Sequence, residues 1–345
     1  MKKKKIWIAV AAIAVLAVIV VFVTRNNGSS PNLGDQNVSA SPYEETYMAY
    51  LNEHGYDGTG EPAYASAEIP IDLNHFTASQ EMNASFADGK LSTSEEGKIT
   101  WSFQVEEEGF YHLRLSYIPI AGTTSDIQRR ILIDGIQCYE GLSQVVLKRR
   151  YQDEEIKVKN DNEIRPSSAE VFTESTVYVE DYNRRTGDPF LFYLTKGEHT
   201  LTIESAKEAV AYTDITFTHK EKERAYAETI EELKSKYPVY TGDVMIGQAE
   251  RRDGITTDIT KSSSSINIKK NYSDANNMPY HPYHIIYNTI GGDSFKTSGD
   301  FITWEVEVPQ EGLYALTFKG RQAQNRGVTS YRRMYINGEV PYAEM

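Results

Sequence analysis

The chain has 345 residues, of which 40% are hydrophobic and 25% charged, an ordinary composition for a globular protein. Its formal net charge of −13 argues against a nucleic-acid partner, which would require a basic surface. The single cysteine, Cys138, excludes an intrachain disulfide bond.

The N-terminus carries an export signal. Lys2 to Lys5 precede an uninterrupted apolar run of 18 residues from Ile6 to Val23, which as a helix would span about 27 Å, close to the thickness of a bilayer core. Because the run ends in Val-Phe-Val-Thr-Arg, a poor cleavage site, we expect an uncleaved transmembrane helix; the alternative is a cleaved signal peptide. In either case the body of the protein should lie on the extracellular face of the cell membrane or be secreted.

Residues 24–62 are predicted to form a flexible spacer, because Gly, Ser, Asn and Pro dominate its first half. Within this spacer, residues 43–53 (YEETYMAYLNE) have the pattern of a short amphipathic helix. Gly55, Gly58 and Gly60 should end that helix.

Residues 63–219 have the sequence pattern of short β-strands. In one stretch four apolar residues alternate with polar ones: Ile99, Trp101, Phe103 and Val105. Asp134-Gly135 marks a hairpin turn, and further turns recur along the segment. This pattern predicts an all-β fold, a β-sandwich of the jelly-roll type, and it places Trp101 in the core. Residues 140–189 are a long, charged insertion, which in a compact β domain is usually functional or disordered.

Residues 220–238 are predicted to form a short linker α-helix. Four apolar residues fall on one stripe of that helix: Tyr226, Ile230, Leu233 and Tyr237. The helix should pack on a neighbouring module, with its Glu and Lys residues facing solvent.

The segment that follows repeats the first module. Residues 302–342 match residues 99–139 without a gap, at 13 identities in 41 positions, and a repeat of this length indicates two copies of one folding unit. Arg129-Arg130 returns as Arg332-Arg333, and one of each pair should face outward in a structural ion pair, because neighbours on a strand point to opposite faces. Trp304, the counterpart of Trp101, is expected in a core.

The second module, residues 239–345, is predicted to be an incomplete jelly roll. The first copy continues for about 80 residues past Tyr139, whereas the second stops just after its equivalent, Tyr342. A sheet without its last strands exposes edges and apolar surface, so we expect the chain to be a fragment.

The framework resembles the galactose-binding-like jelly rolls, especially carbohydrate-binding modules of families 6 and 35. The matching motifs are Ala67-Glu68, Trp101-Ser102-Phe103-Gln104-Val105, Gly109-Phe110-Tyr111-His112-Leu113, Ile133-Asp134-Gly135, the stretch from Leu194 to Leu201, and Asp214-Ile215. The resemblance covers about residues 65–218 fully and 240–345 in part. It implies that an oligosaccharide or polysaccharide is the partner.

A narrower resemblance is to extracellular solute-binding proteins of Gram-positive sugar ABC transporters, which carry two such modules. The residues that carry it are Tyr280-His281-Pro282-Tyr283-His284, Asn288-Thr289-Ile290-Gly291-Gly292 and Trp304-Glu305-Val306-Glu307-Val308-Pro309. This resemblance implies a transporter permease as a further partner. The chain departs from these proteins because it contains no solute-binding domain.

Sugar recognition needs an aromatic plane and a few convergent polar groups. The candidate residues in the insertion are Arg149, Tyr151, Tyr182 and Arg184, and those in the second module are Tyr280, His281, Tyr283, His284, Arg321 and Asn325. The alternative is that these residues only pack the two modules together.

The family resemblance also implies a structural Ca²⁺ ion, held by Glu68 and Asp214. Calcium takes six to eight oxygen ligands, so backbone carbonyls would have to supply several of them. The alternative is that both residues are solvated or capping carboxylates. The sequence contains no nucleophile elbow or phosphate loop, and we expect no enzyme activity.

These patterns favour an extracytoplasmic carbohydrate-binding protein, the module-bearing part of an ABC transporter solute-binding protein. A second hypothesis is a structural spacer whose modules bind nothing. A third is a fragment of a carbohydrate-active enzyme.

Overall fold

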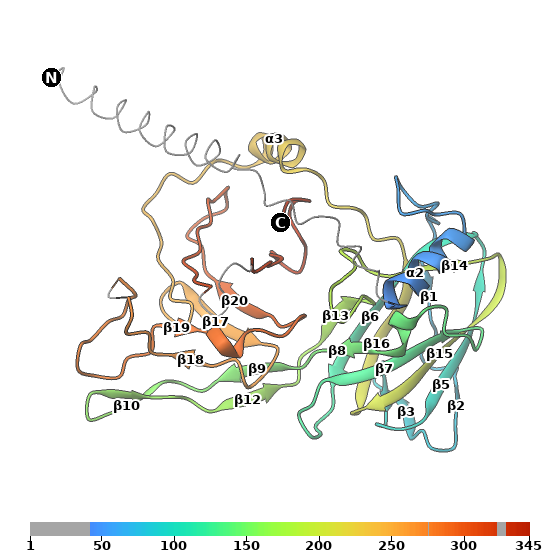
Figure 1. Cartoon of the computed structure of the whole chain (residues 1–345), viewed down its shortest axis with the longest axis horizontal. Helices are drawn as coiled ribbons and strands as arrows, with labels where there is room; N and C mark the ends of the chain where they lie inside the picture. Colours follow the sequence, from blue (N-terminus) through green and yellow to red (C-terminus); the bar gives the residue numbers. More distant parts are fainter. Residues whose placement is uncertain (1–41, 275, 323–328) are drawn as a thin grey trace. The chain divides into compact units, whose positions relative to one another are not determined.

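A computed structural model describes residues 42–274, 276–322 and 329–345. Two β-sheets form the first module, as the alternation in its sequence predicts (Figure 1). The seven-stranded sheet contains β1 (Ile69–Pro70), β3 (Ala84–Ala87), β4 (Lys90–Thr93), β6 (Gly109–Pro119), β13 (Ser175–Tyr178), β14 (Leu191–Leu194) and β16 (Val210–Thr218). Its order is β13-β6-β16-β4-β3, with β1 also on β16 and β14 also on β6.

The second, five-stranded sheet has the order β2-β5-β15-β7-β8. Its strands are β2 (Thr77–Ala78), β5 (Lys98–Val105), β7 (Ile127–Ile133), β8 (Val145–Leu147) and β15 (Gly197–Lys207). The predicted alternation is confirmed on β5, where Ile99, Trp101, Phe103 and Val105 are buried and the residues between them are not. The apolar faces of both sheets contribute to one hydrophobic core, which also contains Leu113, Phe192 and Phe217.

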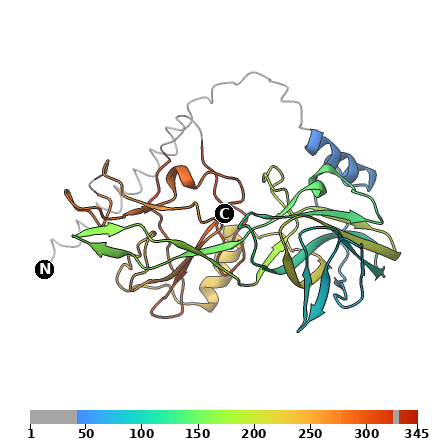
Figure 2. The ribbon, with the colours of Figure 1, turned by 90° about the horizontal axis from the view of Figure 1, so that it is seen from below.

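Helix α2 (Pro42–Glu53) belongs to this core, although the sequence analysis places it in a spacer. Tyr47, Tyr50 and Leu51 are buried, and the Tyr47 ring lies 4.7 Å from that of Tyr139, next to the short 3-10 helix η1 (Glu140–Ser143). The Tyr47 hydroxyl also accepts the backbone N–H of Leu191 at 2.9 Å. Figure 2 shows α2 against the sandwich. The helix is therefore part of the first module, which begins before residue 63.

The predicted insertion forms a β-arm. Its strands are β9 (Arg150–Asp153), β10 (Lys157–Lys159), β11 (Asn162–Ile164) and β12 (Ser168–Val171). The β10–β11 hairpin forms the tip, and β9 pairs with β12 along the stem. The other edge of β9 pairs with β17 (Thr256–Lys261), so the arm continues a sheet of the second repeat copy in the order β12-β9-β17-β20 (Figure 1).

The second copy contains β17, β18 (Ile268–Lys269), β19 (Thr289–Ile290), the 3-10 helix η2 (Gly292–Ser294) and β20 (Ile302–Val306). It reproduces local features of the first copy. Asn337-Gly338 turns with positive φ angles of 54° and 88°, as Asp134-Gly135 does with 52° and 75°. The Tyr314 hydroxyl donates to the carbonyl of Gln310, as that of Tyr111 does to Glu107. The two copies therefore share this turn and this tyrosine hydrogen bond.

Helix α3 (Tyr226–Lys236) lies within the predicted linker, and none of its residues is buried. Its main aromatic contact is an edge-to-face packing of Tyr226 on Tyr342, with ring centroids 4.9 Å apart. In the part of the chain that the structure describes, no helix is long and apolar enough to cross a membrane. The predicted anchor, residues 1–23, lies outside the described residues.

Candidate functional site

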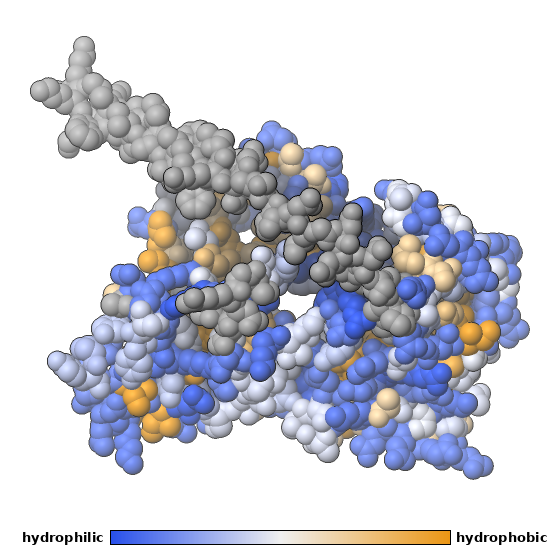
Figure 3. All heavy atoms as spheres, viewed as in Figure 1, coloured by the Kyte–Doolittle hydropathy of each residue, from blue (hydrophilic) through white to orange (hydrophobic). Residues whose placement is uncertain are grey.

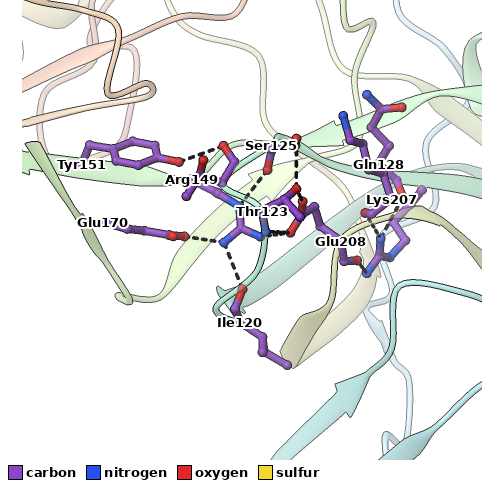
Figure 4. A network of polar contacts seen from close by, with 11 residues as sticks. Ile120, Thr123, Ser125, Gln128, Arg149, Tyr151, Glu170, Lys207 and Glu208 are labelled. Carbon is purple, nitrogen blue, oxygen red and sulfur yellow. Dashed lines mark hydrogen bonds and ion pairs between the residues drawn. The ribbon is translucent and has the colours of Figure 1, made fainter.

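The insertion's first candidate, Arg149, is the centre of a buried polar network (Figure 4). Its guanidinium is fully buried and pairs with Glu208 at 2.8 Å and with Glu170. The same side chain donates to the carbonyls of Ser125 and Ile120 at 2.7 and 3.0 Å. The guanidinium is therefore hydrogen-bonded inside the protein, where it connects the start of the β-arm to the sandwich.

Glu208, the acceptor in this network, lies in the tight turn between β15 and β16 with a positive φ of 64°. Burial would raise the pKa of this carboxyl, but hydrogen bonds from Thr123 and the charge of Arg149 outweigh it and hold the pKa below its usual value. Arg129 also reaches the turn, where its guanidinium donates to the Glu208 carbonyl at 2.9 Å. The turn is thus held by two buried arginines.

The other candidates from the insertion are dispersed. Tyr151 is buried, and its hydroxyl donates to the carbonyl of Thr124 at 3.0 Å (Figure 4). Tyr182 is half-buried with the Lys148 ammonium 5.8 Å from its ring centroid, whereas Arg184 is exposed and paired with Glu180. The structure does not gather these residues around one cavity.

Two candidates of the second copy, His281 and His284, line a cavity of about 450 Å³ with residues of the β10–β11 hairpin. Their rings lie 4.3 Å apart, and the His281 Nδ1 accepts the backbone N–H groups of Tyr283 and His284. Glu163, also in the lining, is engaged by Arg251 at 2.9 Å and by the backbone N–H of Tyr287 at 2.6 Å. Hence the Glu163 carboxylate and the His281 Nδ1 of this cavity already have protein partners.

Three further candidates of the second copy are not among the residues that line that cavity. Tyr280 and Tyr283 are exposed, the latter at 88%. Arg321 is also exposed and donates to the hydroxyl of Ser273 at 2.9 Å. Asn325 lies outside the described residues.

The proposed calcium ligands, Glu68 and Asp214, lie on either side of Arg114. The guanidinium is 3.7 Å from the Glu68 carboxylate and 3.4 Å from that of Asp214. Thr218 donates to Glu68 at 2.7 Å, and Thr216 donates to Asp214 at 3.0 Å. In the described segments no group of three or more His, Cys, Asp or Glu residues could hold a metal ion. The Arg114 guanidinium between the two carboxylates offsets one of their two negative charges, and a Ca²⁺ ion held by Glu68 and Asp214 stays a prediction.

A different cavity, which we call the aromatic cavity, opens beside α2 and measures about 420 Å³. It is lined by Tyr47, Met48 and Leu51 of α2, by Tyr56, Gly58, Pro62 and Tyr64 of the following segment, by His112 of β6, and by Thr186, Gly187, Asp188, Pro189 and Leu191. Gly58 has a φ of +85°, and a Cβ there would lie 3.2 Å from the Met48 methyl group, so glycine lets this segment fold back over the helix.

Half-buried tyrosine rings and one carboxylate set the chemistry of the aromatic cavity. The Tyr64 ring stacks on His219 with centroids 4.1 Å apart, and Tyr56 packs edge-to-face on Phe110. Asp188 is exposed at the rim. Such a combination of aromatic surface and a few polar groups is typical of small-molecule sites.

The electrostatics leave Asp188 as the only charged side chain among these lining residues at neutral pH. Burial lowers the pKa of His112 to about 4, helped by His219 and Lys220, so its imidazole is neutral. Burial, with Tyr56 and Asp188 nearby, raises the pKa of Tyr64 to about 12. The aromatic cavity therefore presents neutral hydroxyls and rings beside a single negative charge.

Sequence reasoning missed this cavity because its walls come from three separated segments. The signal available was the density of tyrosines between residues 43 and 64, which was assigned to a helix and a spacer. Nothing local in the sequence links Tyr64 to Asp188, which lies 124 positions further along.

A scan against protein-family models gives no match, and a search of curated proteins gives none. Among solved structures, the chain is similar to a family 35 carbohydrate-binding module from Clostridium thermocellum, at 12% identity and a TM-score of 0.27, over 45% of this chain and 100% of that module. It is also similar to the C-terminal family 6 module of a laminarinase from Zobellia galactanivorans, at 8% identity and a TM-score of 0.27, over 44% and 100%.

A third similar structure is the exo-β-1,3-galactanase from Phanerochaete chrysosporium, in complex with β-1,3-galactotriose. The identity is 12% and the TM-score 0.25, over 47% of this chain and 31% of the galactanase. At these identities and TM-scores the similarities carry no argument about the ligand of this chain.

Proposed function

We propose that the chain is a non-catalytic carbohydrate-binding protein that holds a neutral sugar in the aromatic cavity. The observation that carries this proposal is the cavity of about 420 Å³ that is lined by Tyr56 and Tyr64 and by the exposed Asp188. Aromatic rings offer an apolar surface to the C–H face of a sugar, and a carboxylate accepts hydrogen bonds from its hydroxyls.

The charge of the cavity supports a neutral ligand. A uronic acid or a sugar phosphate would bring a second negative charge beside Asp188, with no cation among the lining residues at neutral pH to balance it. Neutral hexoses and pentoses meet no such repulsion.

The cellular setting of the proposal rests on the sequence. The basic and apolar N-terminus supports attachment to the membrane with the modules on the extracellular side, or secretion. The motifs around Tyr280 and Trp304 support membership of a sugar ABC transporter, with the permease as partner.

A structural role is the second candidate, and the buried contacts where the β-arm joins the sandwich favour it. Arg149 and Tyr151, expected to contact sugar, instead connect the β-arm to the sandwich, and β9 pairs with β17 of the second copy. An arm of this kind would fix the spacing of the two copies whether or not a sugar binds.

A glycan array separates these two candidates. The full chain should bind neutral oligosaccharides and leave uronate-containing glycans unbound. Absence of binding to every glycan on the array, by protein whose circular dichroism shows folded β-structure, would leave only the structural role. Binding of uronates in preference to neutral sugars would show that the aromatic cavity is not the site.

A further inference from the structure

Asp188 lies on one loop of the first module, residues 180–189, which we call the rim loop. The residues at positions 186–189 of this loop all line the aromatic cavity. The two ends of the loop meet in the core, where the backbone N–H of Phe190 donates to the carbonyl of Val179 at 2.9 Å and both residues are buried. Since these ends are fixed, the position of Asp188 depends on what holds the part between them.

The first half of the rim loop is held from within. Asp181 is buried, and its carboxylate accepts the backbone N–H groups of Asn183 and Arg185 at 2.9 and 2.6 Å. The backbone N–H of Arg184 donates to the carbonyl of Asp181 at 2.9 Å, and Arg184 has a positive φ of 56°. These bonds shape a tight turn over residues 181–185, which precedes the half of the loop that lines the cavity.

The second repeat copy donates hydrogen bonds to both halves of the rim loop. The Ser298 hydroxyl donates to the carbonyl of Asn183 at 3.0 Å, and the Arg333 guanidinium donates to the carbonyl of Gly187 at 2.6 Å. Figure 3 shows a mainly hydrophilic surface on one face of the molecule, in keeping with polar contacts of this kind. Gly187 lines the aromatic cavity and directly precedes Asp188, so the second copy contacts the loop beside the charged group of the cavity.

Two acidic residues close to the rim loop favour the position of Arg333. Burial raises the pKa of Glu180, and the charges of Arg184 and Arg333 oppose this rise. Burial would also raise the pKa of Glu223, but hydrogen bonding and charge from Lys220, with a smaller effect of Arg333, hold it below its usual value. The guanidinium thus has favourable charge interactions in addition to its hydrogen bond to the loop.

A largely buried ion-pair network fixes the segment that carries Ser298. The Lys148 ammonium of the first module lies 2.8 Å from Asp126 and 3.4 Å from Asp300 of the second copy. Asp300 also accepts the Ser262 hydroxyl at 3.1 Å. Only 13% of the Lys148 side chain and 7% of the Asp300 side chain are exposed, so salt screens this pair little. Ser298, two residues before Asp300, therefore lies on a segment that is anchored to the first module.

We propose that the second copy positions Asp188 at the rim of the aromatic cavity, with Ser298 and Arg333 as positioning residues. This inference rests on the proposed function, because its effect on binding requires that the cavity holds a sugar. A loop that is ordered before the sugar arrives loses less conformational freedom on binding, so the affinity is higher. The second copy thus contributes to recognition without touching the sugar.

Amide hydrogen exchange tests the positioning in the absence of any sugar. A double variant of the full chain, Ser298→Ala with Arg333→Met, removes both hydrogen bonds to the rim loop. The matched control is Ser263→Ala with Arg332→Met, two residues whose hydrogen bonds stay within the second copy. Exchange over residues 182–188 should be about threefold or more faster in the double variant than in the wild type, and unchanged in the control. Equal exchange in all three proteins would overturn the inference, whether or not a sugar binds. Exchange in β5 reports whether the first module stays folded.

Titration with the neutral oligosaccharide that binds best on the glycan array then tests the effect on recognition. The double variant should weaken this binding by about threefold or more, and it should cause no further loss in an Asp188→Asn background, because it acts through that carboxylate. Unchanged affinity despite faster exchange, or an equal loss in the Asp188→Asn background, would overturn the inference. If the wild-type chain binds no neutral sugar, the proposed function fails, and exchange over residues 182–188 alone decides whether the second copy holds the loop.

Discussion

His112 and Asp188 determine the charge of the aromatic cavity at the scale of single residues. His112 is buried, and its Nδ1 accepts the backbone N–H of Lys220 at 3.0 Å, an interaction that needs this nitrogen unprotonated. Its neutrality removes a positive charge that would otherwise attract anions. Asp188 is exposed and keeps an accessible carboxylate at the rim.

Replacing His112 with Asn should flatten the dependence of stability on acid pH. The folded pKa of about 4 lies below the ordinary 6.5, so the folded state binds fewer protons between these values. The free energy of unfolding should therefore fall as pH drops from about 6.5 to 4, by on the order of 3 kcal/mol, and be fully present above that window. His112→Asn keeps a hydrogen-bond acceptor without the titration. Urea unfolding at four pH values measures how the free energy of unfolding changes with pH in the wild-type protein and in His112→Asn. Equal slopes for the two proteins would show that His112 does not cause the pH dependence.

Changing the charge at Asp188 should change which sugars bind. Asp188→Lys places a cation at the rim, so uronate-containing oligosaccharides should gain detectable binding while neutral ones weaken. Glu198→Lys, a change of the same charge at an exposed residue of β15 that does not line the cavity, is the matched control. Competition titrations in low and high salt measure the effect. A gain of uronate binding in both variants would mean that net charge, not the cavity, decides.

The β-arm and the β15–β16 turn depend on one another at the scale of elements. Arg149 stands at the start of the arm, Glu170 near its end, and Glu208 in the turn, so a single buried guanidinium joins all three. Ion pairs of this kind contribute little net stability over an apolar packing, but losing one partner leaves charges buried without compensation.

Arg149→Met should therefore destabilise the first module by about 3–5 kcal/mol, because Glu170 and Glu208 lose their counter-ion inside the protein. Arg130→Met is the matched control: its pair with Glu204 at 3.2 Å is partly exposed, and its loss should cost about 1 kcal/mol or less. Thermal and urea unfolding measure both values. Equal effects of the two substitutions would contradict the role of burial.

The difference between predictable and unpredictable elements follows from sequence distance. Strands β5 and β7 could be predicted because alternation is local. The same rule predicted that one arginine of each pair faces outward: this is confirmed in the first copy, where Arg129 is buried and Arg130 forms an ion pair at the surface, and it is wrong in the second, where Arg332 and Arg333 are both exposed. The pairing of β9 with β17 could not be predicted, since no local pattern sets a register between residues 108 to 110 positions apart. The aromatic cavity could not be predicted for the same reason, because the separate segments that line it meet only after folding.

The internal repeat organises the whole molecule, and the two copies differ in how completely they are packed. The prediction that Trp101 is in the core is confirmed, at 1% exposure, but Trp304 is only half-buried and donates to the carbonyl of Ala249. The framework motifs are alike in both copies, so the difference comes from the strands that cover them. Burial is a property of the assembled sheets, which is why equivalent residues can be core in one copy and surface in the other.

The central claim is that a neutral sugar binds beside Tyr64. Calorimetric titration of the full chain with the best-bound neutral oligosaccharide, in calcium and in EDTA, tests it against Tyr64→Ala and the matched control Tyr226→Ala, an exposed tyrosine of α3. We predict saturable binding that is the same in calcium and in EDTA. Tyr64→Ala should weaken this binding by about tenfold or more, which corresponds to about 1.4 kcal/mol, and Tyr226→Ala should leave it unchanged. Binding that both variants retain, or that EDTA abolishes, would contradict the account.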